Sequence, residues 1–285
     1  MVVLVTGANG QLGQSLHFIA KNHLEITFVF CDSKTLDITN LVNVSNVFEQ
    51  FKPNFCINAA AYTAVDKAES EPEKAFAINV TGAKNLAEVC KSHNTALLHV
   101  STDFVFDGNA NTPYLETDIP SPTGVYGQTK LDGERVIQAI CNKHYIVRTS
   151  WVYSQFANNF MKTMLRFGRE RDTLSVVEDQ IGTPTNAIDL ANALVRMIQK
   201  TDSYSAENFG IYNFSNQGQC SWYDFAKTIF ENNDVKIDLK PISTCSYPTL
   251  AKRPMYSVLD KSKIKKIFGI EIKEWQESLK TIEIE

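Results

Sequence analysis

The order of strand-like and helical segments is the feature of this sequence that most constrains its fold. Through the first half of the chain, short apolar runs rich in β-branched residues alternate with segments of helical periodicity. The strand-like runs are residues 2–6, 26–31, 55–58, 95–101 and 144–149, and the helical segments are residues 11–22, 41–51, 72–92 and 124–141. Strands that alternate with helices form right-handed crossovers and a parallel sheet. We therefore expect an α/β fold with a doubly wound parallel sheet of the Rossmann type.

The alternation loosens after about residue 150. The later expectations are helices at residues 158–171, 187–199 and 221–230, a strand at 173–177 and a proline-rich loop at 241–254. We expect a dinucleotide-binding Rossmann domain at residues 1–152, with residues 179–214 returning to it. Residues 153–178 and 215–285 are expected to form a smaller C-terminal substrate-binding lobe.

The net charge of −4 disfavours nucleic-acid binding, because that function needs a basic face. The one dense basic run, residues 261–266, is more typical of a solvated helix face. No apolar stretch is long enough for a membrane helix, and the chain enters a strand at Val2 without the features of a signal peptide. The six cysteines form no Cys-x-x-Cys pair, so reduced buried thiols are expected. These features predict a cytoplasmic protein without a membrane or nucleic-acid partner.

Three glycines, Gly7, Gly10 and Gly13, lie between the first strand-like run and the first helical segment. This is the position of a dinucleotide-binding fingerprint, in which glycine permits a tight turn and a close approach of the backbone to a pyrophosphate. The helix N-terminus that follows offers free N–H groups and a positive dipole to that anion. The spacing is G-x-x-G-x-x-G instead of G-x-G-x-x-G, so the strand–turn–helix context carries the prediction.

An acidic residue, Asp32, ends the second strand-like run 19 residues after Gly13. A carboxylate about 20 residues beyond the turn is placed to bind ribose hydroxyls and repels a 2′-phosphate, which favours NAD. Lys34 softens that repulsion, so NADH and NADPH both remain candidates; the alternative for Asp32 is a plain turn residue at a strand end. Asp37 either lies beside the adenine or, like Thr39, serves as the N-cap of the next helix.

Polar residues follow the fourth strand-like run, at the sheet edge where ligands of open α/β sheets bind, with Thr102 and Asp103 among them. Tyr126 and Lys130 are spaced i, i+4 on a predicted helix, so their side chains share one face. A fixed ammonium beside a phenol favours the phenolate and lowers the phenol pKa from about 10. Such a tyrosine can give its proton to a ketone, with the Thr102 hydroxyl sharing the hydrogen bond to the carbonyl oxygen. An isolated Tyr-x-x-x-Lys pair is more often an ordinary surface helix pair.

These ordered motifs resemble the extended short-chain dehydrogenase/reductase superfamily, and in particular its dTDP-4-dehydrorhamnose reductase (RmlD) family. The resemblance runs from residue 1 to at least residue 260, and several motifs are specific to this family. The matching segments are GANGQLG at 7–13, NAAAYTAVDKAE at 58–69, STDFVFD at 101–107, YGQTKLDGE at 126–134, RTSWVY at 148–153, DQIGTPT at 179–185 and YPTLAKRP at 247–254. The resemblance implies reduction of the C4 ketone of dTDP-4-dehydro-6-deoxy-L-mannose to dTDP-L-rhamnose, a step that supplies cell-surface polysaccharide, with hydride from NADPH or NADH.

The resemblance also implies roles for individual residues. Tyr126 is the general acid and Lys130 its partner, while Thr102 and Asp103 lie at the sugar. Trp151 packs against the substrate, although an ordinary core tryptophan is the alternative, and Arg253 meets a phosphate or the thymidine end. The residues expected at the cofactor are Gly7, Gly10, Gln11, Leu12, Gly13, Asp32, Asp37, Ile38, Ala60, Ala61, Tyr62, Tyr126 and Lys130.

Some members of this family carry Mg²⁺ at acidic side chains near a subunit interface. Ser15 and Ile188 stand here where an acidic residue would be needed, which disfavours Mg²⁺ and a metal-bridged dimer. We expect no metal site. The expected partner is a nucleotide-sugar substrate, and the chain is expected to be a monomer or a homodimer.

Three other functions compete with this prediction. A dehydratase of the same superfamily carries Asp-Glu after the Thr, but Phe104 follows Asp103 here, which disfavours dehydration. A sister 4-ketoreductase that makes another epimer would use the same residues and stays open. A non-catalytic regulatory subunit has no chemical need for Thr102, Tyr126 and Lys130, so their presence favours an enzyme.

Overall fold

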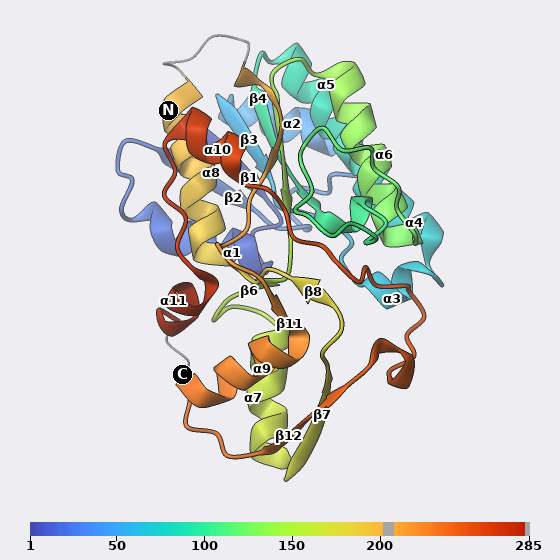
Figure 1. Ribbon diagram of the computed structural model, residues 1–285. Helices are drawn as coiled ribbons and strands as arrows, with labels where there is room; N and C mark the ends of the chain where they lie inside the picture. Colours follow the sequence, from blue (N-terminus) through green and yellow to red (C-terminus); the bar gives the residue numbers. More distant parts are fainter. Residues whose placement is uncertain (202–207, 283–285) are drawn as a thin grey trace.

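A parallel sheet of six strands forms the centre of the computed structural model, which describes residues 1–201 and 208–282 (Figure 1). The strands are β1 (Val2–Thr6), β2 (Thr27–Cys31), β3 (Phe55–Asn58), β4 (Ala96–Thr102), β5 (His144–Thr149) and β10 (Gly210–Asn213). They are arranged in the order β10-β5-β4-β3-β1-β2, and every pairing is parallel. The strand order reverses between β1 and β3, and ligands of open α/β sheets bind at the carboxyl ends of the strands at such a point.

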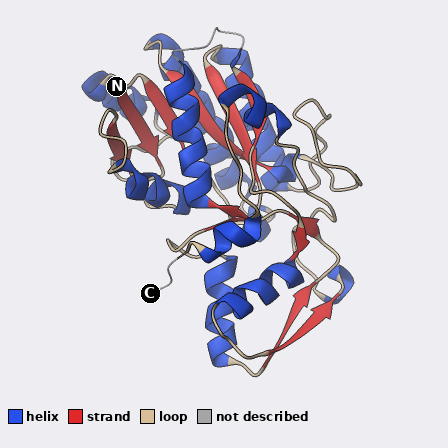
Figure 2. Ribbon diagram, turned by 60° about the vertical axis from the view of Figure 1, so that its left-hand side comes forward, coloured by secondary structure: helices blue, strands red, loops and turns tan. Residues whose placement is uncertain are grey.

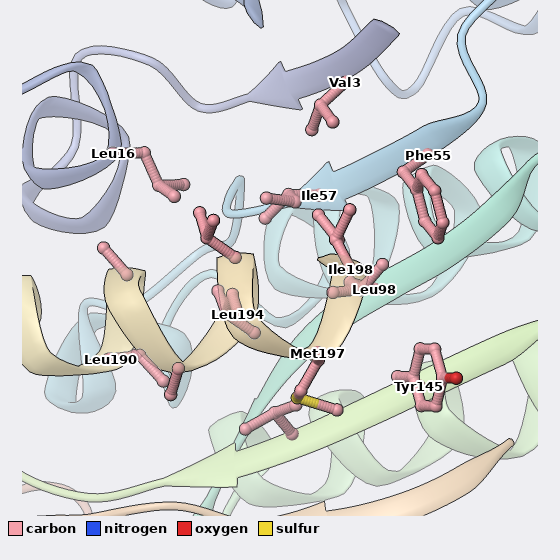
Figure 3. Packing of buried hydrophobic residues seen from close by; sticks show 14 of the residues in the cluster. Val3, Leu16, Phe55, Ile57, Leu98, Tyr145, Leu190, Leu194, Met197 and Ile198 are labelled. Atoms are coloured by element: carbon pink, nitrogen blue, oxygen red, sulfur yellow. The ribbon is translucent and has the colours of Figure 1, made fainter. Parts of the chain in front are cut away.

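Helices cover both faces of this sheet, as expected for a doubly wound fold (Figure 1). The helices α1 (Gln11–Ala20) and α8 (Ala187–Thr201) cover one face, and α2 (Leu41–Phe51), α5 (Gly82–Ser92) and α6 (Val125–Ile140) cover the other. Successive residues of β1 point to opposite faces, so Val3 packs in the same cluster as Leu16 and Leu194, whereas Leu4 packs in the cluster of Val44 (Figure 3). Burial of both faces explains why the strands read as continuous apolar runs.

A second, smaller core lies below the carboxyl ends of the strands in the view of Figure 1, and Figure 2 shows the same separation. Its main elements are α7 (Phe160–Glu170), β7 (Thr173–Val177), α9 (Trp222–Asn232), β12 (Asp238–Ile242) and α11 (Trp275–Lys280). The Ser221 side chain caps α9 in a capping box with Asp224. We propose that the chain divides into a Rossmann domain and a substrate lobe. In this division β10 is a strand of the sheet in the Rossmann domain, and α8 covers that sheet.

Shorter elements connect these layers. They are α3 (Val65–Ala68), α4 (Pro72–Phe76), the π-helical turn η1 (Ala77–Thr81), the 3₁₀ turn η2 (Asp103–Val105), β6 (Val152–Tyr153), β8 (Ile181–Gly182), β9 (Thr185–Asn186), β11 (Cys220–Ser221), the 3₁₀ turn η4 (Thr244–Ser246) and α10 (Ser262–Phe268). None of the described helices is both long enough and apolar enough to cross a membrane.

The predicted α/β fold is confirmed, and the structure modifies three of the specific expectations. The helix expected at residues 72–92 contains the π-helical turn η1, which adds a residue to one turn. Pro241 lies in β12 and not in a loop. Among the described strands β12 pairs with β7 alone, so a missing N–H is tolerated on its free side. The basic run at 261–266 is only partly solvated, because Lys261 is buried and Ile264 and Phe268 of α10 pack in the core of the sheet.

An ion pair between α6 and β5 lies entirely inside the protein. Arg148 Nη2 donates to Glu134 Oε2 at 2.7 Å and Arg148 Nε donates to Glu134 Oε1 at 3.0 Å, with both side chains 1% exposed. The guanidinium also lies 5.1 Å from the centre of the Phe106 ring. A buried charge whose partner is removed is strongly destabilising, since no water replaces the lost contacts.

The substitution Glu134→Ala therefore leaves an uncompensated charge and should lower the free energy of unfolding by about 3–5 kcal/mol. Urea-induced unfolding followed by circular dichroism measures this loss. The control is Arg135→Ala, which breaks the exposed pair between Arg135 and Asp132 and should cost under about 1 kcal/mol. Equal losses in the two variants would contradict the role assigned to the buried pair.

Candidate active site

The glycine turn between β1 and α1 is packed so closely that side chains would not fit. Gly7 has a φ of +66°, and a Cβ there would lie 2.7 Å from the amide nitrogen of Ala60. A Cβ on Gly13 would lie 2.3 Å from the carbonyl oxygen of Gly7. Gly10 is the N-cap of α1 and provides no side-chain cap, so the first N–H groups of the helix stay available to a ligand.

The side chains near this turn have different surroundings. The Gln11 side chain contacts residues of the second half of the chain. Its Nε2 donates to Val152 O at 3.2 Å, and its Oε1 accepts from Ser154 Oγ at 3.0 Å. Leu12 is buried in the core of the sheet, so only its backbone is available to a cofactor. A groove of about 470 Å³ adjoins the turn and is lined by Ala8, Asn9, Gln14, His17, Phe18, Phe30, Asp32, Thr35 and Phe156.

Asp32 lies at the end of β2 and closes a local turn. Its Oδ1 accepts from Lys34 N, Thr35 N and Thr35 Oγ1, and its Oδ2 accepts from Asn9 Nδ2 at 3.2 Å. The hydrogen bond from the Thr35 backbone, followed by that from its hydroxyl, lowers the pKa of the Asp32 carboxyl. The carboxylate is therefore ionised at neutral pH and keeps acceptor capacity on Oδ2 for a ribose hydroxyl.

The segment that follows β2 differs from the expectation. Asp37 is exposed and accepts from the backbone and hydroxyl of Thr39, but the N-cap of α2 is Asn40, whose side chain accepts from Asn43 N. Neither Asp37 nor Thr39 is thus the cap. Ile38 is buried in the core.

The end of β3 lies beside the glycine turn, as the contact between Gly7 and Ala60 shows. Ala60 and Ala61 are half-buried, whereas Tyr62 is buried and donates from its hydroxyl to Glu71 Oε2 at 2.8 Å. The π-helical turn η1 carries Asn79, whose side chain bonds to both backbone groups of Tyr62. These contacts fix the chain on this side of the candidate cofactor crevice.

Thr102 and Asp103 lie at the carboxyl end of β4 and the start of η2. Thr102 Oγ1 accepts from Phe104 N at 3.2 Å and donates to Asp103 Oδ1 at 3.0 Å. Asp103 is 2% exposed, and its Oδ2 is buried without a hydrogen-bond partner among the described residues. Burial raises the pKa of Asp103 to about 6, although the nearby hydroxyls of Ser257 and Thr102 lower it.

Tyr126 lies near this strand end on α6, and its pKa differs from the expectation. Burial raises the pKa of Tyr126 to about 12, the Thr102 hydroxyl lowers it, and the Asp103 carboxylate raises it. The expected lowering by Lys130 is not observed, because the lysine amine turns toward the sheet. Lys130 Nζ donates to Val100 O at 2.7 Å. Tyr126 is therefore a protonated phenol at neutral pH, which is the form that a general acid requires.

The other two residues predicted at the substrate, Trp151 and Arg253, contact other residues of the protein. The indole of Trp151 stacks on that of Trp222, with ring centres 3.5 Å apart and planes 10° apart. Arg253 forms a forked ion pair with Asp66, with Nη2 donating to Oδ2 at 2.6 Å and Nη1 to Oδ1 at 2.9 Å. Both are partly exposed, so each retains surface that a ligand can contact.

Several residues at the site were not predicted individually. Asp66 lies within the motif at 58–69, which assigns it no role by itself, and its pairing with Arg253 joins positions 187 residues apart. His99 is 1% exposed and lies 3.2 Å from the amine of Lys130, a contact for which the sequence offers only an alternating strand position as a signal. Within residues 1–201 and 208–282, no cluster of three or more His, Cys, Asp or Glu side chains could hold a metal ion.

The glycine turn at the sheet reversal, with Thr102, Tyr126 and Lys130 at the neighbouring strand end, defines an oxidoreductase of the short-chain dehydrogenase/reductase class. The chain belongs to the RmlD family, since the family model described as the RmlD substrate binding domain matches residues 1–284. The dTDP-4-dehydrorhamnose reductase of Aggregatibacter actinomycetemcomitans is 46% identical over 286 residues, which cover 98% of this chain and 97% of the relative.

Two solved structures of dTDP-4-dehydrorhamnose reductases are similar throughout. The one from Clostridium acetobutylicum is 43% identical with a TM-score of 0.93, covering 98% of this chain and 97% of its own. The one from Bacillus anthracis, solved in complex with NADP, is 40% identical with a TM-score of 0.92, covering 98% of this chain and 96% of its own.

The buried carboxyl of Asp103 predicts an inverted pH dependence of stability. Its pKa is about 6 in the folded protein against 3.8 for a free aspartate, so the folded state binds more protons between these values. This group therefore costs almost no stability at about pH 3 and about 3 kcal/mol at pH 7. In urea unfolding, Asp103→Asn should match the wild type at about pH 3 and gain stability relative to it as the pH rises to 7. A difference that does not change with pH would contradict the burial argument.

Proposed function

We propose that this chain reduces the C4 ketone of dTDP-4-dehydro-6-deoxy-L-mannose to dTDP-L-rhamnose, with Tyr126 as the general acid. One observation carries the proposal: the protonated phenol of Tyr126 lies beside the Thr102 hydroxyl at the carboxyl edge of the sheet. Membership of the RmlD family supports the choice of substrate. The product would then serve the synthesis of cell-surface polysaccharide.

The proton chemistry follows from the surroundings of Tyr126. Its raised pKa keeps the proton on the phenol until the C4 oxygen gains negative charge. The Thr102 hydroxyl turns from Asp103 toward that oxygen and stabilises it by a second hydrogen bond. Lys130 is one helical turn from Tyr126, and its amine would have to turn from Val100 O toward the phenol to stabilise the phenolate that proton transfer leaves behind.

The cofactor crevice has the groups that a dinucleotide requires. The N-terminus of α1 and the close glycine packing suit a pyrophosphate, and Asp32 Oδ2 suits a ribose hydroxyl. Bound NADPH or NADH would supply the hydride. The NADP complex of the relative from Bacillus anthracis supports the phosphorylated cofactor, and Lys34 is exposed beside Asp32. We infer that both cofactors bind, within about one order of magnitude of each other.

The nucleotide-sugar is proposed to lie between the sheet and the smaller lobe, where Trp151 and Arg253 stand. A planar indole suits a sugar ring or a base, and a guanidinium fork suits a diphosphate. Arg253 is held by Asp66, so a diphosphate would have to share or replace this carboxylate. The free cysteines, five of them buried, suit a reducing compartment, and we propose that the protein works in the cytoplasm.

A direct assay tests this function against its alternatives. We expect the purified protein to consume NADPH with dTDP-4-dehydro-6-deoxy-L-mannose and to release dTDP-L-rhamnose, identified by NMR. A different epimer in the product would identify a sister 4-ketoreductase. No consumption of NADPH or NADH would favour a non-catalytic subunit and contradict the proposal.

The substitution Tyr126→Phe removes the proton donor and keeps the ring. We expect turnover to fall by about 10²–10⁴-fold, while the affinity for NADPH is unchanged. Steady-state kinetics and a fluorescence titration of NADPH measure the two effects. Tyr223→Phe, in the smaller lobe, is the matched control and should keep wild-type turnover. Near-normal turnover of Tyr126→Phe would contradict its role as the acid.

The substitution Arg253→Ala should raise KM for the nucleotide-sugar by about 30-fold or more, since loss of a charged partner typically costs about 2–5 kcal/mol. The affinity for NADPH should stay the same. Asp66→Asn separates the two functions of this arginine, because it removes the ion pair and leaves the guanidinium free for the diphosphate. A KM that rises equally in both variants would show that Arg253 acts only through Asp66.

A further inference from the structure

The first turn of α6, which carries Tyr126, has no cap from its own residues. Gly124 is the N-cap and has no side chain that could accept a hydrogen bond, and the first turn contains no acidic residue. Val125 is the first residue of the helix, so its N–H has no acceptor within the helix. The acceptor for this N–H must therefore come from another part of the chain or from water.

That acceptor is the carboxylate of Glu69, 56 residues earlier in the chain. Val125 N donates to Glu69 Oε1 at 2.8 Å. A carboxylate at a helix N-terminus forms a charge-assisted hydrogen bond and interacts favourably with the helix dipole. The close approach depends on Gly124, because a Cβ there would lie 2.7 Å from Glu69 Oε1. Glu69 therefore caps α6 from outside the helix.

The same turn of α6 also packs closely against the segment that follows β4. A Cβ on Gly127 would lie 2.2 Å from the carbonyl oxygen of Phe104, two residues after Thr102. The ring of Phe104 meets that of Tyr126 edge-on, with ring centres 5.5 Å apart. The position of the phenol relative to Thr102 therefore depends on how the first turn of α6 is held between Phe104 and the carboxylate of Glu69.

The short helix that carries this carboxylate is itself held in place. Glu69 is the C-cap of α3, which lies at the N-terminal end of α6 (Figure 1). Ala68 of α3 is 0% exposed and packs in the same small cluster as Tyr126. Asp66 of α3 is paired with Arg253 of the C-terminal half. Glu69 therefore extends from a packed element, and its carboxylate is a fixed point for the start of α6.

We propose that Glu69 is a positioning residue for Tyr126: its carboxylate caps α6 and sets the place of the phenol beside Thr102. The proposal rests on the proposed reductase function, because it concerns the acid of that reaction. Glu69 bonds to the helix backbone, so it acts through Tyr126 and exchanges no proton with the substrate. A displacement of about 1 Å at a reacting group can lower a rate by about 100-fold, so one hydrogen bond at the start of α6 affects turnover.

Three substitutions separate the hydrogen bond of Glu69 from its charge. Glu69→Ala removes both. Glu69→Gln keeps an acceptor of the same reach and removes the charge, whereas Glu69→Asp keeps the charge on a side chain one methylene shorter, which withdraws the acceptor from Val125. Positioning requires the acceptor, so Glu69→Gln should resemble the wild type and Glu69→Asp should resemble Glu69→Ala.

The first test uses the cofactor-free protein and needs no turnover. The hydrogen exchange of the Val125 amide, followed by NMR, should become faster by about 10-fold or more in Glu69→Ala and Glu69→Asp, because the amide loses its acceptor. Glu69→Gln should keep the protection. Glu73→Ala, an exposed position on α4, is the matched control and should change nothing. Unchanged exchange in Glu69→Ala would overturn the proposal.

The second test measures how the same variants reduce the nucleotide-sugar. Turnover of Glu69→Ala and Glu69→Asp should fall by about 10- to 100-fold, while KM for the nucleotide-sugar and the affinity for NADPH stay within about twofold of the wild type. Glu69→Gln should restore most of the turnover, and Glu73→Ala should retain all of it. A cap that only stabilises the fold would leave turnover of the folded variants unchanged, and that result would overturn the proposal.

A charge effect on the phenol gives the opposite order. It would keep turnover in Glu69→Asp and lower it in Glu69→Gln, and this outcome would also overturn the proposal. If Glu69→Ala does not fold, the comparison of Glu69→Gln with Glu69→Asp still decides it. Failure of the wild type to reduce the sugar would contradict the reductase function, whereas an active wild type with equally active Glu69 variants would contradict the positioning role alone.

Discussion

The helix α6 carries a lysine and a glutamate into the interior, and the geometry of the candidate site depends on how they are partnered. Lys130 and Glu134 are one helical turn apart, and both are almost completely buried. Removing such groups from water costs several kcal/mol each, so their partners must be held in place. Arg148 on β5 binds the carboxylate of Glu134, while His99 and the Val100 carbonyl on β4 contact the amine of Lys130. These contacts fix α6 against two strands, and Tyr126 is positioned by the same helix before any ligand arrives.

Much of the sheet could be predicted from sequence, because its strands are buried on both faces and read as apolar runs bounded by helical periodicity. The strand β10 could not, since its four residues form a strand only by pairing with β5, more than sixty residues earlier. The π-helical turn η1 could not be predicted either. Asn79 in this turn is held by contacts with Tyr62 and Thr129, and helical periodicity does not encode such contacts. The α10 helix also packs on the sheet through long-range contacts.

The candidate site was predictable wherever its chemistry is local. The glycine turn and Asp32 follow from spacing, and Tyr126 and Lys130 follow from helical periodicity. The direction of the lysine amine was not predictable, since it depends on His99 and Val100 of another element. The same limit applies to Trp151 and Arg253, whose partners Trp222 and Asp66 are distant in the sequence. A single sequence shows which side chains are available, and the folded structure determines which of them are in contact.

The stacked indoles of Trp151 and Trp222 also determine how this protein can be observed. The chain has three tryptophans, and all three pack in the core of the smaller lobe, with Trp275 set edge-on to Phe225. Tryptophan fluorescence therefore reports on that lobe, and the six-stranded sheet contributes no indole to it. Two indoles 3.5 Å apart and nearly parallel also couple their excited states, so the pair has its own circular-dichroism signature. Any event that slides one ring from the other is visible without an added dye.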